Sequence, residues 1–301
     1  MEMFLQAFPH LLISGLVIGC IYGLIAVGFS MLYKASGMLS FAQGDLLTVG
    51  AFIGWTLFAG TIFGWMPNLP YPVAFVLVAV IMFFLGVFIE RVIIRRLIQK
   101  KTQMIYVVLA TIAISFILQN GSMLIWGTHM HSYPQIFSVE AVRILGVQVR
   151  TPALLVVGVS AVAMVGLHIF MNKTKFGTAM RAATMDPLAA RSCGVNVSFT
   201  TGITWGVASA LAGIAGIILG PMFGVFVILG ASIGFKGFAG AVIGGYGNMY
   251  GAIVGGILFG LLETFISYWA SAYRDVIAFS ILLIFLFVRP TGLFNESAIH
   301  D

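Results

Sequence analysis

Charged residues are scarce in this chain of 301 residues: Asp, Glu, Lys and Arg make up 8% of it, and hydrophobic residues make up 60%. A soluble domain carries roughly 25% charged residues, so this chain has too few to cover a water-facing surface. Nine carboxylates oppose fifteen Lys and Arg residues, and the net charge is +6. The basic residues cluster in short loops, where they set membrane orientation, so we expect no nucleic-acid partner.

The sequence also lacks the motifs that mark an enzyme. It has no G-x-S-x-G, no H-E-x-x-H and no phosphate-binding G-x-x-x-x-G-K-[ST], so we expect no catalytic residue or cofactor on this chain. His129 and His131 form an H-x-H pair, but two ligands without a Cys or acidic companion make a weak site, so no metal is expected. Cys20 and Cys193 fall in an apolar segment and a loop, and no disulfide is expected.

Apolar segments near the roughly 20 residues that a bilayer core requires recur along the chain. The expected spans are Leu11–Leu32, Leu46–Phe63, Tyr71–Ile94, Met104–Trp126, Pro152–Phe170, Thr200–Pro221, Tyr250–Ala270 and Val276–Val288. Phe223–Tyr246 is ambiguous, because Lys236 and many glycines interrupt it. We therefore expect an all-α integral membrane protein, a polytopic bundle of about eight or nine transmembrane helices forming a single domain over residues 1–301.

The positive charges predict the orientation of this bundle. Eleven basic residues fall at one set of span ends: Lys34, Arg91, Arg95, Arg96, Lys100, Lys101, Lys173, Lys175, Arg181, Arg191 and Arg289. The alternate loops hold only Arg143, Arg150 and Arg274. The positive-inside rule places the larger group in the cytoplasm and the amino terminus outside. A cytoplasmic carboxyl terminus then requires an odd number of crossings, which favours counting Phe223–Tyr246 as a broken span.

A cytoplasmic loop at residues 172–196 carries signals for a short helix of its own. Asp186 is a good N-cap, Pro187 suits the first helical position, Arg191 lies near the carboxyl end and Gly194 fits the residue after the last turn. A helix of under ten residues is not stable alone in water, so it needs a surface to pack against. An aqueous protein partner is one interpretation, and a connector lying on the membrane surface is the other.

Two polar or glycine-rich segments interrupt the apolar pattern, Ser36–Asp45 and Gly234–Asn248. Non-helical backbone at membrane depth is tolerated only inside protein or beside a wet cavity, and paired interruptions in the two halves point to a transport site. The residues that we expect along this path are Gln43, Asp45, Lys236, Gly240 and Gly244. The alternative is tight helix packing at small residues, which we favour for Gly251-x-x-x-Gly255 taken alone.

Several of these segments resemble one known family. The run Gly15–Phe29 followed by Gly37–Asp45 (GMLSFAQGD) is similar to the opening of the Liv-type branched-chain amino acid ABC permeases. The loop Gly177–Asn196, the segment Ala239–Gly256 and the ending Pro290–Phe294 match further landmarks of that family in the same order. The resemblance covers nearly the whole chain and is closer to the LivH-like than to the LivM-like subunit.

This resemblance implies a permease subunit in the bacterial cytoplasmic (inner) membrane. It implies a LivM-like second permease, two cytoplasmic ABC ATPases that bind ATP and Mg, an extracytoplasmic substrate-binding protein, and contact with membrane lipid. The loop would be the coupling helix that seats on an ATPase, with Gly177, Arg181, Asp186, Pro187, Arg191 and Gly194 as structural or contact residues. Gln43 and Asp45 would lie near the cytoplasmic end of the first loop.

Other functions stay open at this point. Branched-chain amino acids are the default cargo, but urea, short amides and aromatic carboxylates are alternatives within the same family. An ion-coupled secondary carrier would also have broken spans, with Asp45 and Glu263 as proton sites. The short helix after Asp186 separates these classes, because an ATPase partner explains it and a carrier does not.

Overall fold

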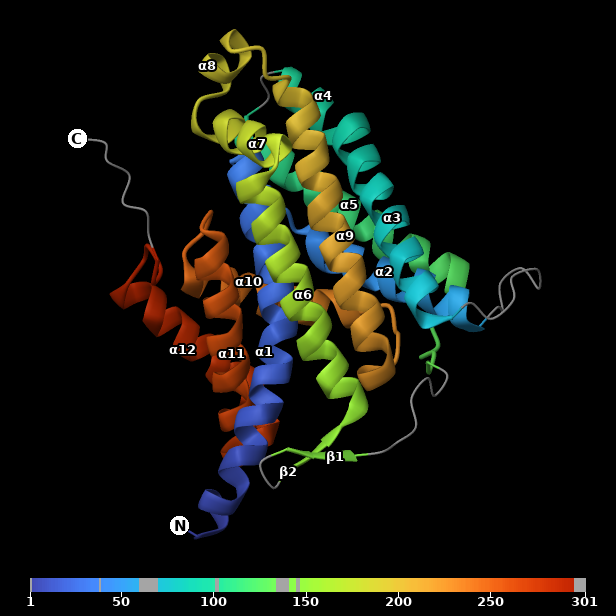
Figure 1. Ribbon diagram of the computed structural model, residues 1–301, viewed down its shortest axis with the longest axis vertical. Helices are drawn as coiled ribbons and strands as arrows, with labels where there is room; N and C mark the ends of the chain where they lie inside the picture. The colour runs from blue at the N-terminus through green and yellow to red at the C-terminus, as the bar shows by residue number, and fades with distance from the viewer. Residues whose placement is uncertain are drawn as a thin grey trace.

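The computed structural model describes residues 2–37, 39–59, 70–100, 103–133, 141–144 and 147–294. The described chain is almost entirely helical (Figure 1). In chain order the elements are α1 (Glu2–Ser36), α2 (Ala42–Ala59), α3 (Tyr71–Ile89), a π-helical turn (Glu90–Ile94), α4 (Arg95–Gln99), α5 (Met104–Trp126), β1 (Ala141–Ile144), β2 (Val147–Arg150), α6 (Thr151–Lys173), α7 (Lys175–Met185), α8 (Pro187–Ser192), α9 (Val197–Phe223), α10 (Leu229–Gly244), α11 (Met249–Ala270), a 3-10 turn (Ser271–Tyr273) and α12 (Arg274–Val288).

The expectation of an all-α polytopic membrane protein is confirmed. Within the described residues, six helical stretches are long and apolar enough to cross a membrane: Ala7–Ser36, Tyr71–Gln99, Ile105–Trp126, Thr151–Lys173, Val197–Phe223 and Met249–Val288. The last stretch contains both α11 and α12, and α2 and α10 are shorter apolar helices. The predicted loop 127–151 also holds the antiparallel pair β1–β2, in which Ala141 lies opposite Arg150.

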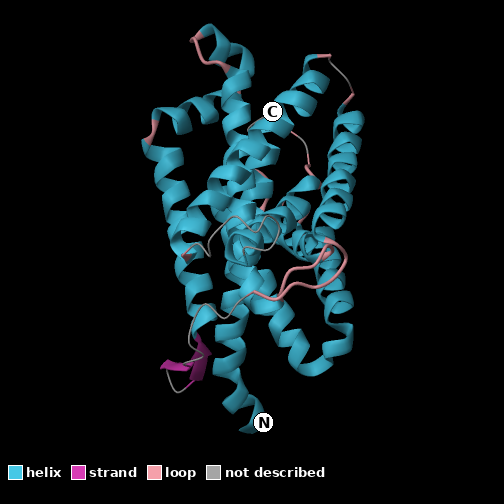
Figure 2. Ribbon diagram, turned by 90° about the vertical axis from the view of Figure 1, so that its right-hand side faces the viewer, coloured by secondary structure: helices cyan, strands magenta, loops and turns pink. Residues whose placement is uncertain are grey.

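The two ends of the bundle differ in the way that the charge count predicts. The helices α4, α7 and α8 lie at one end, and the hairpin β1–β2 and the start of α1 lie at the other (Figures 1 and 2). The first end therefore carries Lys173, Lys175 and Arg191, whereas Arg143 and Arg150 lie in the hairpin. This segregation of charge is the pattern expected of one cytoplasmic and one external end.

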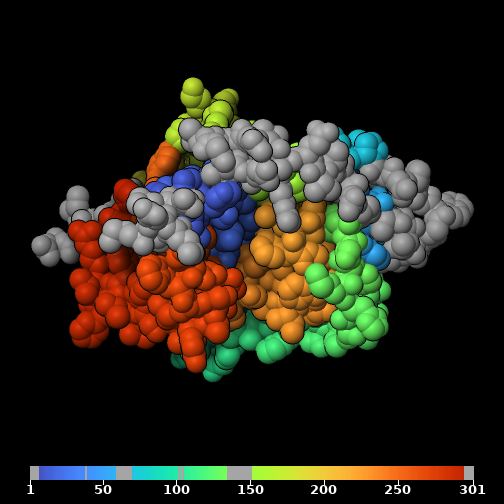
Figure 3. Space-filling model, turned by 90° about the horizontal axis from the view of Figure 1, so that it is seen from below, coloured from blue at the N-terminus to red at the C-terminus, as the bar shows by residue number. Residues whose placement is uncertain are grey.

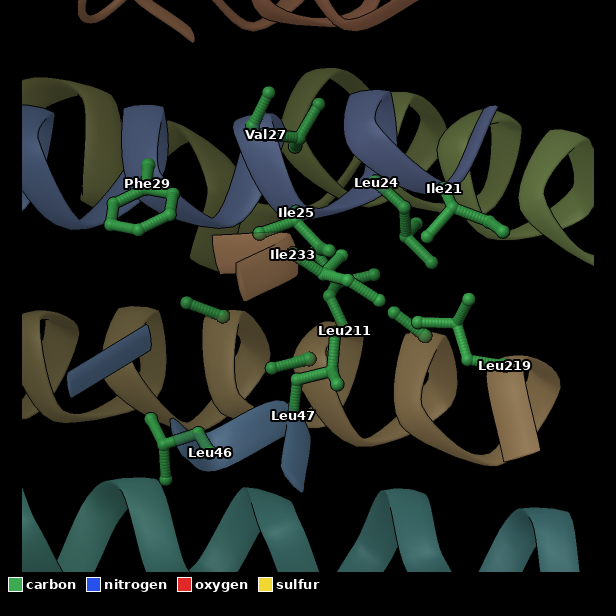
Figure 4. Close-up of a cluster of buried hydrophobic side chains, with 14 of the residues drawn as sticks. Ile21, Leu24, Ile25, Val27, Phe29, Leu46, Leu47, Leu211, Leu219 and Ile233 are labelled. Atoms are coloured by element: carbon green, nitrogen blue, oxygen red, sulfur yellow. The ribbon is translucent and has the colours of Figure 1, made fainter. Parts of the chain in front are cut away.

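The interior is formed by α1, α2, α9 and α10. Leu24, Leu47, Leu211 and Ile233 come from these four helices and point into one buried cluster (Figure 4). The peripheral helices instead turn large apolar side chains outward, among them Phe84 on α3, Leu124 on α5, Val162 on α6 and Phe287 on α12. Outward-facing apolar side chains on this scale are what a lipid-exposed or subunit-facing surface requires.

Glycines allow α1 and α11 to touch through their backbones. A Cβ atom at Gly260 would lie 2.4 Å from the Cα of Gly19, and one at Gly256 would lie 2.4 Å from the Cα of Gly23. In lipid, where no hydrophobic effect drives helices together, such close approach supplies the van der Waals contact that holds them. Small residues are therefore required at these positions.

The predicted interruption at Gly234–Asn248 is wrong over most of its length. α10 is a continuous helix from Leu229 to Gly244, and the break is confined to the turn 245–248, where Gly245 and Gly247 have positive φ angles. Glycine lowers intrinsic helix stability, but here it admits neighbouring backbones, and those contacts hold the helix. Gln43 and Asp45, expected in the first loop, likewise lie in the first turn of α2.

The connection between α9 and α10 returns into the bundle. After Phe223 the chain turns at Gly224, which has a φ of 72°. Val225 then pairs with His131 through two backbone hydrogen bonds of 2.8 Å. Figure 3, seen from the end at which α1 begins, shows this orange segment beside the green residues that follow α5. The first residues of α10 then reach α2, because a Cβ at Gly230 would clash with Gly44.

The glycine contacts predict a position-dependent effect of one methyl group. Gly260→Ala should lower the thermal unfolding midpoint of the detergent-solubilised protein, because overpacking costs about 1–3 kcal/mol. Gly166→Ala on α6 is the matched control: no atom lies within 4 Å of its Cβ position, and Ala favours the helix. Equal midpoints for the two variants would contradict the packing role of Gly260.

Candidate functional site

The short helix predicted after Asp186 is present as α8. The Oδ1 atom of Asp186 accepts hydrogen bonds from the backbone N–H groups of Leu188 (2.8 Å) and Ala189 (3.0 Å), Pro187 occupies the first turn, and Gly194 follows with a φ of 82°. The local capping signals thus specify this helix. Leu188 is 74% exposed, so α8 turns an apolar side chain to the outside.

A second short helix, α7, precedes α8 and was missed from the sequence. Its N-cap is Thr174, whose side chain accepts a hydrogen bond from the backbone N–H of Gly177 at 3.0 Å, and Asp186 ends it. The sequence signal was available, because Thr is one of the residues preferred at an N-cap. The loop 172–196 is therefore a pair of helices, α7 and α8, which we call the coupling hairpin after the role that we propose for it.

Two of the predicted contact residues hold this hairpin to the membrane helices. Gly177 lies directly against the end of α6, where an added Cβ would be 2.3 Å from the carbonyl oxygen of Met171. Arg181 is half-buried and donates a hydrogen bond to the side-chain oxygen of Asn172 on α6. Arg191, by contrast, is exposed on α8. Arg191 is thus the more accessible of these two arginines.

A cavity of about 370 Å³ lies between α1, α2, α5 and α10. Its polar lining consists of Asp45, Ser115 and Gln119, and the rest is apolar. Five phenylalanines line it: Phe29, Phe41, Phe116, Phe235 and Phe238. A small-molecule site typically combines this volume with an apolar wall and a few convergent polar groups.

Asp45 lies at mid-depth in the bundle rather than at its cytoplasmic end, which corrects the expected position. Its Oδ2 atom accepts a hydrogen bond from the hydroxyl of Ser115, which lies near the middle of α5. Gln43 lies at the same depth, because its amide donates to the carbonyl oxygen of Ala208, near the middle of α9, at 3.0 Å. Figure 1 shows α2 and α10 at the middle of the molecule's height.

Ser115 and Gln119 were missed as candidate residues. They are four residues apart on α5, so they share one face of the helix, and both line the cavity. Two polar residues at that spacing in a strongly apolar segment were the signal available in the sequence. Ser115 and Gln119 indicate a functional site only together with Asp45. Asp45 lies 70 positions from Ser115 in the sequence, and the tertiary fold brings the two together.

Four of the five residues predicted along the path lie outside the cavity lining. Gln43 is adjacent to it, and its Oε1 atom has no hydrogen-bond partner among the described residues. Gly240 packs on Gly255 and Gly256, and Gly244 packs on Gly251, so both glycines serve contact between α10 and α11. Gly240 and Gly244 thus fit the alternative of tight helix packing at small residues.

Lys236, the fourth residue outside the lining, belongs to a partly buried ion cluster. Its Nζ atom lies 2.6 Å from Glu263 Oε1 and 3.0 Å from Asp275 Oδ1. The Nε atom of Arg274 lies 3.0 Å from the same Glu263 oxygen, and the hydroxyl of Tyr22 donates to the other at 2.7 Å. The cluster joins α1, α10, α11 and α12 and leaves Glu263 fully paired.

Among the described residues the remaining buried carboxylate is Glu90 in the π-helical turn, which is paired with Arg95 at the start of α4 at a distance of 2.8 Å. No group of three or more His, Cys, Asp or Glu residues that could hold a metal occurs in the part of the chain that the structure describes. His131 is instead bonded through Nε2 to the carbonyl oxygen of Trp126 at 2.9 Å. Cys20 and Cys193 are both free thiols.

Comparison with known proteins assigns the family. Residues 11–286 match the family described as "Branched-chain amino acid transport system / permease component". The chain belongs to this family of ABC transporter permeases. The permease LivH of Escherichia coli K12 is 30% identical over 99% of both chains, and BraD of Pseudomonas aeruginosa is 32% identical over 96% of both. A LivH from Methanocaldococcus jannaschii is 30% identical over 90% of this chain and 87% of its own.

The resemblance seen in the sequence motifs is thus confirmed across almost the full length of the permease. These relatives are named as permease proteins of high-affinity or probable branched-chain amino acid transport systems. The coupling hairpin, the cavity and the ion cluster all fall inside the matched residues.

The ion cluster predicts how the permease responds to loss of one charge. Lys236→Met should lower the thermal unfolding midpoint by an amount equivalent to about 1–3 kcal/mol, because Glu263 stays buried after losing its closest cation. The double variant Lys236→Met with Glu263→Gln should recover part of this loss. The same change at exposed Lys175 should cost no more than about 0.5 kcal/mol. A double variant that is less stable than the single variant would contradict this account.

Proposed function

We propose that this chain is one of two permease subunits of an ATP-binding cassette importer for branched-chain or related amino acids in the bacterial cytoplasmic membrane. A LivM-like permease completes the path, two ATPase subunits with ATP and Mg drive it, and an extracytoplasmic binding protein delivers the cargo. The family assignment and the names of the relatives support this proposal.

The coupling hairpin is the observation that best supports an ATPase partner. α8 lies beyond the ends of α6 and α9 at the basic end of the molecule (Figure 1). Its exposed residues include Leu188, 74% exposed, and Arg191, a combination suited to a groove on a protein. A connector of the same length would not need two capped helices. The hairpin is anchored to α6 at Gly177 and Arg181, so a force applied to α8 reaches the membrane helices.

The path itself is supported by the cavity at Asp45. It lies at mid-depth, where α2 and α10 begin, and it carries a polar group that helix packing does not require. On the side of α5 and α10, the lining residues Phe116 and Phe235 are also exposed at the surface of the bundle. In the proposed assembly the second permease covers this side and completes the path.

The experiment that tests the proposal is reconstitution of the permease pair with its ATPases and binding protein in proteoliposomes. ATP-dependent, vanadate-sensitive uptake of L-leucine is the expected result. Uptake that follows an ion gradient and ignores ATP would favour the secondary carrier and overturn the assignment.

The cap of α8 allows a graded test of coupling. Asp186→Ala should remove about 0.5–2 kcal/mol of helix stability and reduce cargo-stimulated ATP hydrolysis, while the permease still inserts. Asp186→Asn is the matched control, because Asn caps as well as Asp and should keep the stimulation. Normal stimulation in the alanine variant would show that α8 does not couple the two activities.

The orientation can be tested with a native thiol. Cys193 is exposed on the coupling hairpin and Cys20 is buried. A membrane-impermeant thiol reagent should therefore label intact cells poorly and permeabilised cells well. The variant Cys193→Ser with Ser132→Cys should instead be labelled well in intact cells, with little gain on permeabilisation, because Ser132 is exposed near the opposite end. Labelling of Cys193 from outside would overturn the orientation and the docking face together.

A further inference from the structure

The cavity between α1, α2, α5 and α10 contains a carboxylate without a cationic partner. Asp45 is 3% exposed, and its Oδ1 atom has no hydrogen-bond partner among the described residues. Ser115 contacts the other oxygen, and no Lys, Arg or His lines the cavity. In the part of the chain that the structure describes, the other two buried carboxylates, Glu90 and Glu263, are both paired with a cation. A buried carboxylate in this state favours a ligand that supplies positive charge and N–H donors.

The first turn of α10 instead favours a negatively charged group in the same cavity. Gly230 and Ala231 line the same cavity, and the N-cap residue Ile228 offers no side-chain hydrogen bond. The start of a helix carries partial positive charge, and it favours an anion. The N–H of Leu229 donates to the carbonyl oxygen of Phe226 and that of Gly230 donates to the hydroxyl of Thr48 at 2.8 Å, so the attraction for an anion comes from the helix end as a whole. In membrane transporters, helices that begin partway through the membrane direct their amino-terminal ends at anionic groups of the cargo.

The rest of the wall suits an aliphatic group. Phe29, Phe41 and Phe238 enclose the cavity on the side of α1 and α10, and glycines at 44, 230 and 234 leave its floor without side chains. Gly44 and Gly230 are in backbone contact, so the negative side chain and the positive helix end are held at the same place. The cavity thus combines one negative group, one positive helix end and an apolar wall.

We propose that this cavity is a transit site for the zwitterionic head of an aliphatic amino acid. The ammonium group of the cargo binds Asp45 and Ser115, its carboxylate lies at the first turn of α10, and its side chain packs on the phenylalanines. This assignment rests on the proposed permease function and narrows its cargo to aliphatic amino acids. Urea and short amides carry no charge to match Asp45, and aromatic carboxylates carry no ammonium group.

The test uses the complete transporter in proteoliposomes with an unchanged binding protein and L-leucine as the probe. Asp45→Asn keeps the shape of the side chain and removes its charge, so leucine uptake should fall at least tenfold while ATP hydrolysis stays within twofold of wild type. Asp45→Glu should retain part of the uptake. The control Ser280→Ala, exposed on α12 and bonded within its own helix, should leave both rates unchanged.

Uptake per ATP hydrolysed separates a cargo site from a structural role, because misfolding lowers both rates together. Three results would overturn the transit site: normal leucine uptake in Asp45→Asn, equal loss of uptake and hydrolysis, or failure of the permease pair to co-purify. Transport of urea or an amide, with no transport of leucine, by the wild-type complex would also overturn it and leave the ABC permease function standing. Absence of ATP-driven transport of leucine, urea, short amides and aromatic carboxylates by the wild type would instead reject the permease function and, with it, the transit site.

Discussion

Contact between glycine backbones positions the helices that carry Asp45 and Lys236, two of the buried charged residues of this permease. α1 meets α11 at Gly19 and Gly23, α10 meets α11 at Gly240 and Gly244, and α2 meets α10 at Gly44. Helices in lipid gain nothing from burying apolar surface against each other, so packing this close is a principal source of their affinity. The third contact brings Asp45 beside the start of α10, and the second keeps Lys236 within reach of Glu263.

The buried carboxylates of the described chain then fall into two kinds. Glu90 and Glu263 are paired with Arg95 and Lys236, which reduces the cost of keeping charge inside a bundle. Asp45 has only the hydroxyl of Ser115 and lies beside a cavity. An unpaired carboxylate at membrane depth is expensive to retain, and this cost is consistent with the transit role proposed for Asp45.

The helices whose bounds depend on residues close by in the sequence could be predicted from the sequence. Met104–Trp126 was predicted with the bounds of α5, and the cap, proline and glycine around Asp186 specified α8. The sequence misled where tertiary contact overrides propensity: the glycines of α10 indicated a break, but they admit neighbouring backbones and the helix continues. The partners of Asp45 and Lys236 lie 70 and 27 positions away, a relation that no single-sequence pattern encodes.

The coupling hairpin and the cavity are joined by a continuous series of contacts. Arg181 on α7 bonds to Asn172 on α6, and Asn172 bonds to Tyr250 on α11 at 3.2 Å. The first turns of α11 contact the end of α10 at Gly244 and Gly251, and the start of α10 forms one wall of the cavity. Each contact is a hydrogen bond or a backbone contact at a glycine, which leaves little room for one element to move without its neighbour. α10 therefore contacts α11 at one end, which is connected through Asn172 to the hairpin, and forms a wall of the cavity at the other. This position makes α10 the helix through which movement of the coupling hairpin would change the environment of Asp45.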